Sequence, residues 1–335
     1  MTSRNESIQT LRAIAAFVVF LGHAIGMVDN PILLHLKSTP FHFFFDGQCA
    51  VLLFFTITGY YSCKKQSFCL KNYGISLLKK IKKIYPPFLL VLLLAFILCN
   101  RGFSWNEELY TAWGNSFWKN PVPLSIFLQQ CTLLLPSDSK LLNPPIWYLM
   151  ADMRIAFILP FIVFCVRKKT IALAVLLACI LPFFNGIGFL SCLQYYLWGV
   201  IAHKLLSAND AFLVVWQKKQ FRHILLFLGI FLLAIFDIIQ IPEYNAPRIL
   251  KIPQSIGAAL VVVYAATSVA IRYRWLVYFG NISFEFYLIH FVVLLFLRCF
   301  SCHFVFYILF SLLLSFLLAS LLKILFHKIL WYEKK

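Results

Sequence analysis

Apolar runs of close to 20 residues recur along the whole chain, separated by short segments rich in Lys and Arg or in Pro, Asn and Trp. A run of this length can cross the hydrocarbon core of a bilayer as an α-helix. The pattern predicts ten spans, over residues 8–28, 46–63, 84–100, 144–166, 170–186, 189–206, 223–240, 250–271, 275–297 and 303–326. We therefore expect an all-α polytopic membrane bundle, with residues 1–335 forming a single integral-membrane domain.

Most basic residues fall on one side of these spans. The clusters are Lys64, Lys65, Lys71, Lys79, Lys80, Lys82 and Lys83; Arg167, Lys168 and Lys169; Lys218, Lys219 and Arg222; Arg272 and Arg274; and Lys328, Lys334 and Lys335. An excess of Lys and Arg marks the cytoplasmic side of a membrane protein. We expect both termini in the cytoplasm and the protein in the inner (cytoplasmic) membrane.

The composition agrees with a membrane protein and argues against nucleic acid or metal as a ligand. The chain is 62% hydrophobic and 13% charged, against about 25% charged in soluble domains. Its net charge of +18 follows from the positive-inside bias, so no nucleic-acid partner is expected. The ten cysteines are scattered through apolar runs without the spacing of a zinc site, so no metal is expected either.

The longest extracytoplasmic segment is expected between residues 101 and 143. It carries Trp105, Trp113 and Trp118, and tryptophan is enriched at membrane interfaces. An interfacial or re-entrant helix is predicted near residues 124–135.

Two ionisable side chains lie inside the first predicted span, at the ends of the run R-A-I-A-A-F-V-V-F-L-G-H from Arg12 to His23. Eleven helical residues return to within about 20° of the same face and separate the two groups by about 16 Å. An arginine inside a span costs roughly 2.5–3.5 kcal/mol, so it usually faces a polar interior. The shared stripe favours a functional site over an Arg12 that snorkels to the interface and a His23 that only bonds a carbonyl.

Three further blocks follow along the chain. They are F-D-G-Q-C-A-V-L-L-F-F-T-I-T-G-Y-Y over residues 45–61, I-W-Y-L-M-A-D-M-R-I over 146–155, and N-I-S-F-E-F-Y-L-I-H over 281–290. Together with the Arg–His spacing, and in this order, they resemble the motifs of the acyltransferase 3 family of integral-membrane acyltransferases. Thr58 stands where that family usually has Ser, and Asp152 where it usually has Glu.

The resemblance implies an acyl-coenzyme A donor, above all acetyl-CoA, on the cytoplasmic side. It implies as acceptor a hydroxyl of a cell-envelope polysaccharide or lipid-linked sugar. Histidine is the side chain best suited to take a proton from such a hydroxyl near neutral pH. We therefore assign His23 as general base, Arg12 to hold or polarise the donor, and Asp152 and Arg154 to orient His23 or the substrate.

The basic cluster at the start of the third span is a candidate mouth for the donor path. Coenzyme A carries several phosphate charges, and Lys binds phosphate as a point charge. We expect one or two of Lys79, Lys80, Lys82 and Lys83 to bind the donor, while the others set topology and attract membrane lipid.

Several alternatives stay open at this stage. His23 can act as a general base or as a nucleophile that carries the acyl group. Phe54, Phe55, Trp147 and Tyr287 are more typical of packing, and His290 suits packing as well as a site. Glu285 and His290 lie about 140° apart on a helix and should not form a dyad. A transporter or flippase of glycan intermediates is the rival function, and the oligomeric state is open.

Overall fold

The computed structural model describes residues 6–63, 70–166, 168–184, 189–208, 218–241, 247–267, 273–300 and 303–332. Fourteen α-helices are described: α1 Glu6–Met27, α2 Pro31–Lys37, α3 Gly47–Ser62, α4 Leu70–Asn100, α5 Ala112–Asn115, α6 Leu124–Cys131, α7 Ile146–Cys165, α8 Ile171–Ile180, α9 Leu190–Ala208, α11 Lys219–Leu233, α12 Ile235–Ile239, α13 Lys251–Thr267, α14 Arg274–Leu297 and α15 Phe304–Tyr332. No strand occurs in these ranges, so the predicted all-α class is confirmed.

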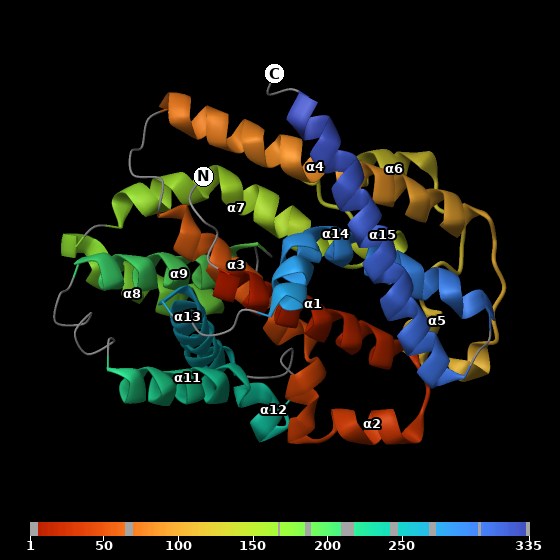
Figure 1. Ribbon diagram of the computed structural model, residues 1–335, viewed down its shortest axis with the longest axis horizontal. Coiled ribbons are helices and arrows are strands. Elements are labelled where there is room, and N and C mark those ends of the chain that lie inside the picture. The colour runs from red at the N-terminus through yellow and green to blue at the C-terminus, as the bar shows by residue number, and fades with distance from the viewer. Residues whose placement is uncertain are drawn as a thin grey trace.

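Each of the ten predicted spans is a helix or a pair of consecutive helices (Figure 1). Six of them are long and apolar enough to cross a membrane by length and composition, namely those containing α1, α4, α7, α13, α14 and α15. The helices α3, α8 and α11 are shorter, and α9 is more polar because it contains Gln194, His203 and Lys204. Several basic residues of the predicted clusters, including Arg167, Arg272 and Lys334, lie outside the described residues.

Two helix pairs at the centre pack at very short distance because glycine faces the partner backbone. A Cβ atom at Gly280 of α14 would collide with the carbonyl of Gln9 in α1. A Cβ atom at Gly59 of α3 would collide with the backbone of Tyr196 in α9, and one at Gly199 of α9 with that of Thr56. Small residues at helix interfaces allow such close approach in membrane proteins. The two contacts fix α1 on α14 and α3 on α9.

The segment from residue 101 to 143 covers the end of the bundle where α1 ends, at Met27. Val28 pairs with Tyr110 in an isolated antiparallel bridge, and the Thr111 hydroxyl donates to the Gly26 carbonyl at 2.8 Å. The helix predicted in residues 124–135 is present as α6, Leu124–Cys131. Figure 1 shows α2, α5 and α6 gathered toward this end of the molecule.

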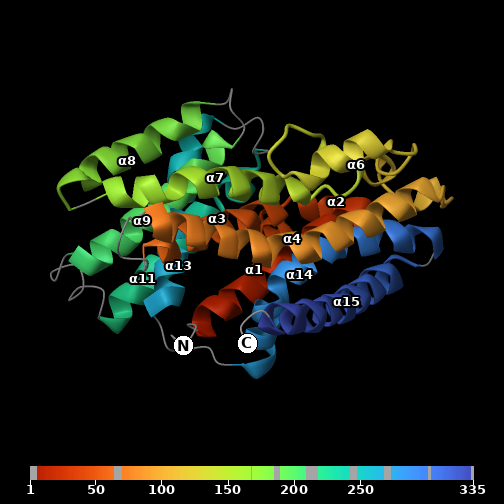
Figure 2. The ribbon, with the colours of Figure 1, turned by 90° about the horizontal axis from the view of Figure 1, so that it is seen from above.

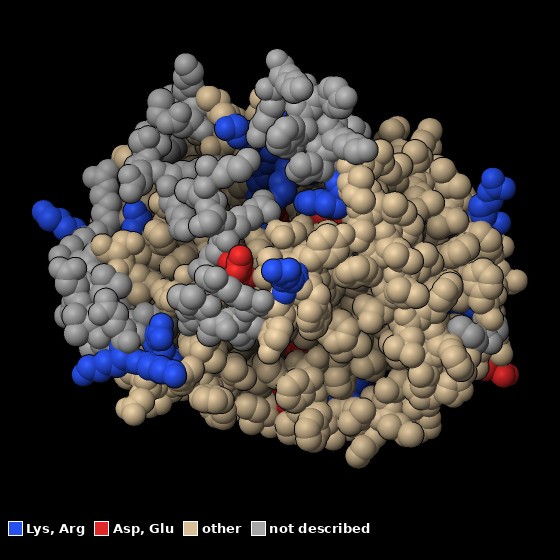
Figure 3. Space-filling model, in the orientation of Figure 1, with Lys and Arg blue, Asp and Glu red and all other residues tan. Residues whose placement is uncertain are grey.

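The opposite end of the bundle carries the start of α1 and the end of α15. Figure 2 shows these two helix ends on the same side of the molecule. In Figure 3 most visible Lys and Arg side chains lie in the left half and the centre of the view, while a broad surface on the right is almost free of charged side chains. A multi-pass membrane protein needs such an uncharged surface because lipid tails cannot solvate charge.

Candidate active site

His23, in the next-to-last turn of α1, contacts His290 of α14. The His23 Nδ1 and His290 Nε2 atoms are 2.9 Å apart, and the rings are nearly parallel with centroids 5.2 Å apart. The Gln9–Gly280 contact, the Phe20–Phe286 ring contact and this pair follow one another along both helices. Helices α1 and α14 therefore run in the same direction, and their close packing brings the two histidines together.

Hydrogen bonding determines which nitrogen of each ring carries the proton. The His290 Nδ1 atom lies 2.8 Å from the Tyr287 carbonyl and 3.2 Å from the Phe286 carbonyl. A carbonyl only accepts, so His290 Nδ1 is protonated and the neutral ring has its lone pair on Nε2. That lone pair accepts the proton of His23 Nδ1, which leaves a lone pair on His23 Nε2. The hydrogen bonds from the carbonyls through His290 to His23 thus leave a proton acceptor, His23 Nε2, at a fixed position.

Aromatic rings surround His23. Trp113 of α5 stacks on it with centroids 6.2 Å apart, and Phe291 meets it edge-on at 5.0 Å. His290 is fully buried, His23 is partly exposed, and Trp113 is 41% exposed. Solvent can therefore reach His23, whereas His290 is closed off from solvent.

Asp152 lies in a second polar cluster, toward the other end of the bundle. Its carboxylate is 2.9 Å from Lys80 Nζ of α4 and accepts a hydrogen bond from the Tyr196 hydroxyl of α9 at 2.7 Å. Lys80 Nζ also donates to the Asp152 carbonyl at 3.1 Å. We call Lys80, Asp152 and Tyr196 the Asp152 cluster. Because the Asp152 side chain is about 10% exposed, its charge needs the lysine as a partner.

Arg12 is connected to the Asp152 cluster through Tyr148 of α7. Tyr148 interacts electrostatically with both Arg12 and Asp152 and hydrogen-bonds the Thr58 side chain. Thr58, which replaces the usual Ser of the resembled motif, thus keeps a hydroxyl at this position. Arg12 and Asp152 therefore both lie in the neighbourhood of Tyr148.

Asp152 and Arg154 were expected to orient His23 or the substrate, and neither is placed against His23. Asp152 is held by Lys80 and Tyr196, and Arg154 Nε donates to the Leu134 carbonyl at 3.2 Å. Of the four lysines predicted to bind the donor, Lys80 is turned toward Asp152, while Lys79, Lys82 and Lys83 are exposed on α4.

The partner of His23 is His290, for which the sequence left packing and function open. Glu285 lies on another face of α14 than His290, in agreement with the predicted angle between them. Its carboxylate accepts a hydrogen bond from Lys323 Nζ at 3.0 Å. The signal that could have singled out His290 is its place in the fourth block. For Trp113 the sequence indicated only that tryptophan is common at membrane interfaces.

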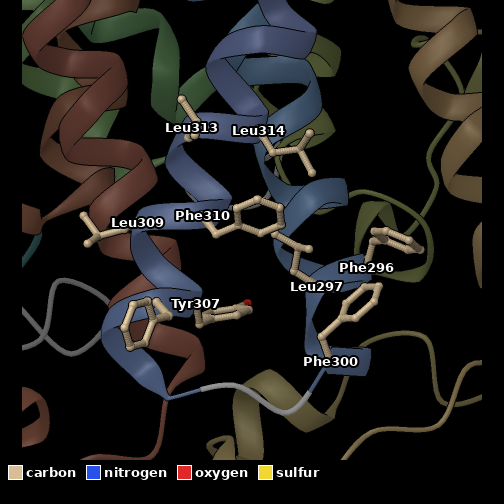
Figure 4. Close-up of a pocket in the computed structure, with 9 residues that line it drawn as sticks. Phe296, Leu297, Phe300, Tyr307, Leu309, Phe310, Leu313 and Leu314 are labelled. Atoms are coloured by element: carbon tan, nitrogen blue, oxygen red, sulfur yellow. The ribbon is translucent and has the colours of Figure 1, made fainter.

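A cavity of about 700 Å³ lies between α14 and α15 near their connection (Figure 4). Its lining is apolar, from Phe296, Leu297, Phe300, Phe306, Tyr307, Leu309, Phe310, Leu313 and Leu314. The Tyr307 hydroxyl donates to the Leu294 carbonyl at 2.9 Å. The cavity offers no acid or base, so the chemistry is placed at the histidine pair.

Comparison with known proteins gives one match. A family model described as Acyltransferase domain, Acyl_transf_3, matches residues 5–324, which include both histidines and the whole Asp152 cluster. No curated protein and no solved structure matches the chain.

Proposed function

The chain belongs to the acyltransferase 3 family, and on that premise we propose that it transfers an acyl group, most simply acetyl, from cytoplasmic acyl-CoA to a hydroxyl of an envelope carbohydrate. The acceptor is a polysaccharide or a lipid-linked sugar on the far side of the inner membrane. Both termini are cytoplasmic in this proposal, because the basic clusters adjoin the ends of the chain. The histidine pair then lies toward the extracytoplasmic surface, beneath Trp113.

The observation that carries the proposal is the 2.9 Å contact of His23 Nδ1 with His290 Nε2, from which we infer a lone pair on His23 Nε2. This lone pair takes the proton of the acceptor hydroxyl while the hydroxyl oxygen attacks the thioester carbonyl carbon. The tetrahedral intermediate collapses with cleavage of the C–S bond, and the proton on His23 passes to the departing thiolate. The products are an oxygen ester and free coenzyme A, so atoms and charge balance. The lone pair of His290 stabilises the imidazolium that forms on His23 during the step.

Arg12 is proposed to hold the donor. It lies eleven residues from His23 on the same helix, about 16 Å away. A donor whose thioester reaches His23 passes Arg12 and Tyr148 on the way from the cytoplasmic end. The guanidinium supplies fixed hydrogen-bond donors for the polar part of that chain or for the thioester oxygen.

The same geometry supports a two-step variant. His23 Nε2 attacks the thioester carbon and coenzyme A leaves as thiolate, which gives an acyl-imidazolium whose Nδ1 proton stays hydrogen-bonded to His290. The acceptor hydroxyl then attacks this acyl group, neutral imidazole leaves, and the hydroxyl proton passes through water to the thiolate. Single-turnover labelling with radioactive acetyl-CoA in the absence of acceptor separates the routes, since only the two-step route leaves label on the protein.

The test of the function is a glycan and enzyme measurement on His23→Ala. Cells with the parent gene should show envelope glycans heavier by one acyl unit in mass spectrometry than cells without it. His23→Ala should abolish this shift, with loss of rate of at least about a hundredfold for purified protein. His35→Ala, in exposed α2, is the matched control and should behave like the parent.

Two outcomes would contradict the proposal. Full activity of His23→Ala would remove the base from the mechanism. Movement of glycan intermediates across the membrane without any acylated product would favour the transporter. A carboxy-terminal reporter that is active only in the cytoplasm checks the orientation and should score positive.

A further inference from the structure

A third group of polar side chains lies on the Met27 end of the bundle and does not include the histidine pair. His42 belongs to the 3₁₀ helix η1, Pro40–Phe45; Asp46 caps the start of α3; and Asp237 lies in α12. One nitrogen or oxygen atom from each side chain lies within 4.8 Å of the other two. The closest pair is His42 Nδ1 and Asp237 Oδ1, at 2.6 Å.

The group has more negative charge than its own imidazole can neutralise, and part of that charge lies on the buried Asp237. Asp237 is 5% exposed, and its Oδ2 atom is buried and has no hydrogen-bond partner within the described part of the chain. Asp46 uses Oδ1 to accept from the backbone N–H groups of Gln48 and Cys49. Two carboxylates therefore face one imidazole, which carries at most one positive charge. A buried carboxylate oxygen without a donor is costly, and a bound cation would satisfy it.

We propose that His42, Asp46 and Asp237 bind a divalent cation of the zinc type. Imidazole nitrogen and carboxylate oxygen are the ligands that zinc takes at about 2.0–2.2 Å, and three protein ligands plus water complete a tetrahedral site. The imidazole favours zinc over Mg²⁺ and Ca²⁺, which prefer sites made only of oxygen. The His42–Asp237 hydrogen bond is exchanged for two bonds to the ion. Asp46 Oδ2 becomes the third ligand atom while Oδ1 keeps its capping role.

The sequence gave no sign of this site because its ligands come from distant segments. Residue 42 precedes the second predicted span and residue 46 begins it, whereas residue 237 lies near the end of the seventh. Only the packing of η1 against α12 unites them, and Figure 1 shows α12 beside the turn that leads from α2 into α3. The cation would join these two segments outside the core of the bundle.

The site lies next to the support of His23. A Cβ atom at Gly22 would collide with the carbonyl oxygen of Phe45, the last residue of η1. A cation that fixes η1 therefore also fixes the backbone that packs beside His23. This gives the ion a structural role, and its binding can be measured independently of whether acyl transfer is the function.

The test is direct metal binding by the full-length protein in detergent, purified without a polyhistidine tag. After treatment with a chelator and dialysis against Zn²⁺, the parent should retain one zinc per chain by mass spectrometry of the metal and melt at higher temperature than the chelated sample. Asp237→Asn keeps the shape of the side chain and removes its charge. It should lose the bound zinc and the shift in melting temperature, with affinity at least about tenfold weaker.

Asp29→Asn and His35→Ala are the controls, because both residues are exposed in the same segment and lie outside the group. Both variants should bind zinc like the parent. If Asp237→Asn does not fold, His42→Gln takes its place. The rival arrangement is a metal-free ion pair, since the hydrogen bond to Asp237 raises the pKa of His42. Equal zinc retention by the parent and by Asp237→Asn or His42→Gln, or no zinc retention by the parent, would overturn the proposal.

Discussion

The histidine pair and the Asp152 cluster are both polar sites inside an apolar bundle, but the pair is made of uncharged rings and the cluster mainly of charged groups. The pair consists of two aromatic rings that share one hydrogen bond and end on a backbone carbonyl. The cluster consists of a carboxylate, an ammonium group and a phenol, with a guanidinium in electrostatic range through Tyr148. The first holds a proton acceptor without a formal charge, and the second holds charges that neutralise each other.

This difference suggests how the two tasks of the proposed acyl transfer are divided. Removing a proton from a hydroxyl requires an unprotonated base, and a neutral imidazole provides one without the cost of a carboxylate charge beside lipid. Binding a polar donor requires fixed charges, and inside the bundle each charge needs a counter-ion to offset its desolvation. We therefore expect substitutions in the pair to reduce kcat and substitutions in the cluster to act mainly on donor binding and stability.

The largest effect is expected from His290→Ala. Without His290, His23 Nδ1 loses its acceptor, and the tautomer with the lone pair on Nε2 is no longer favoured. We expect kcat to fall by about a hundredfold, with KM for the donor little changed. Steady-state kinetics with acetyl-CoA measure both constants. A rise in KM with unchanged kcat would mean that His290 serves packing or binding and would remove the contrast between the regions.

A smaller effect is expected from Arg12→Lys. The lysine keeps the charge but not the planar set of donors, so the loss should be roughly tenfold and should appear mainly in the KM for acyl-CoA. Binding of a non-hydrolysable acyl-CoA analogue provides an independent readout. Equal binding by the lysine variant would show that Arg12 acts as a point charge only.

The Lys80–Asp152 ion pair should contribute more to the free energy of unfolding than to the catalytic rate. Asp152→Asn leaves Lys80 without its carboxylate, and because Lys80 is 24% exposed we expect a loss of about 1–3 kcal/mol. Thermal unfolding of parent, Asp152→Asn, Lys80→Gln and the double variant forms a double-mutant cycle. The coupling energy should be about 1 kcal/mol. Additive effects would indicate that the two groups do not depend on each other.

The smallest effects are expected at the exposed lysines of α4. Lys79→Gln, Lys82→Gln and Lys83→Gln, made singly, should raise the KM for acyl-CoA by a few-fold at one or two positions. The effect should shrink as salt rises, because exposed charges are screened within about 8 Å at physiological ionic strength. Parent-like binding by all three at low salt would move the donor entrance elsewhere on the cytoplasmic surface, with Lys169 next to be tested.

The sequence predicts the helices of this molecule well because bilayer thickness sets the length of an apolar run. All ten expected spans are helical, and Arg12 and His23 could be singled out because an ionisable residue inside such a run is expensive. The contacts were harder to predict. His290 and Lys80 reach their partners through packing between helices far apart in the chain, which depends on close approach at positions such as Gly280. Periodicity describes a single helix and contains no information on which neighbour it meets.

The histidine pair joins residues separated by 267 positions in the chain, and this separation has a consequence for biosynthesis. Helix α1 is made first and α14 nearly last, on the order of tens of seconds later at ordinary rates of translation. Until α14 inserts, the His23 imidazole has no fixed tautomer and the nascent protein has no organised base. Under the proposed function, a chain that stops before α14 therefore lacks the organised base and should not transfer acyl groups to water.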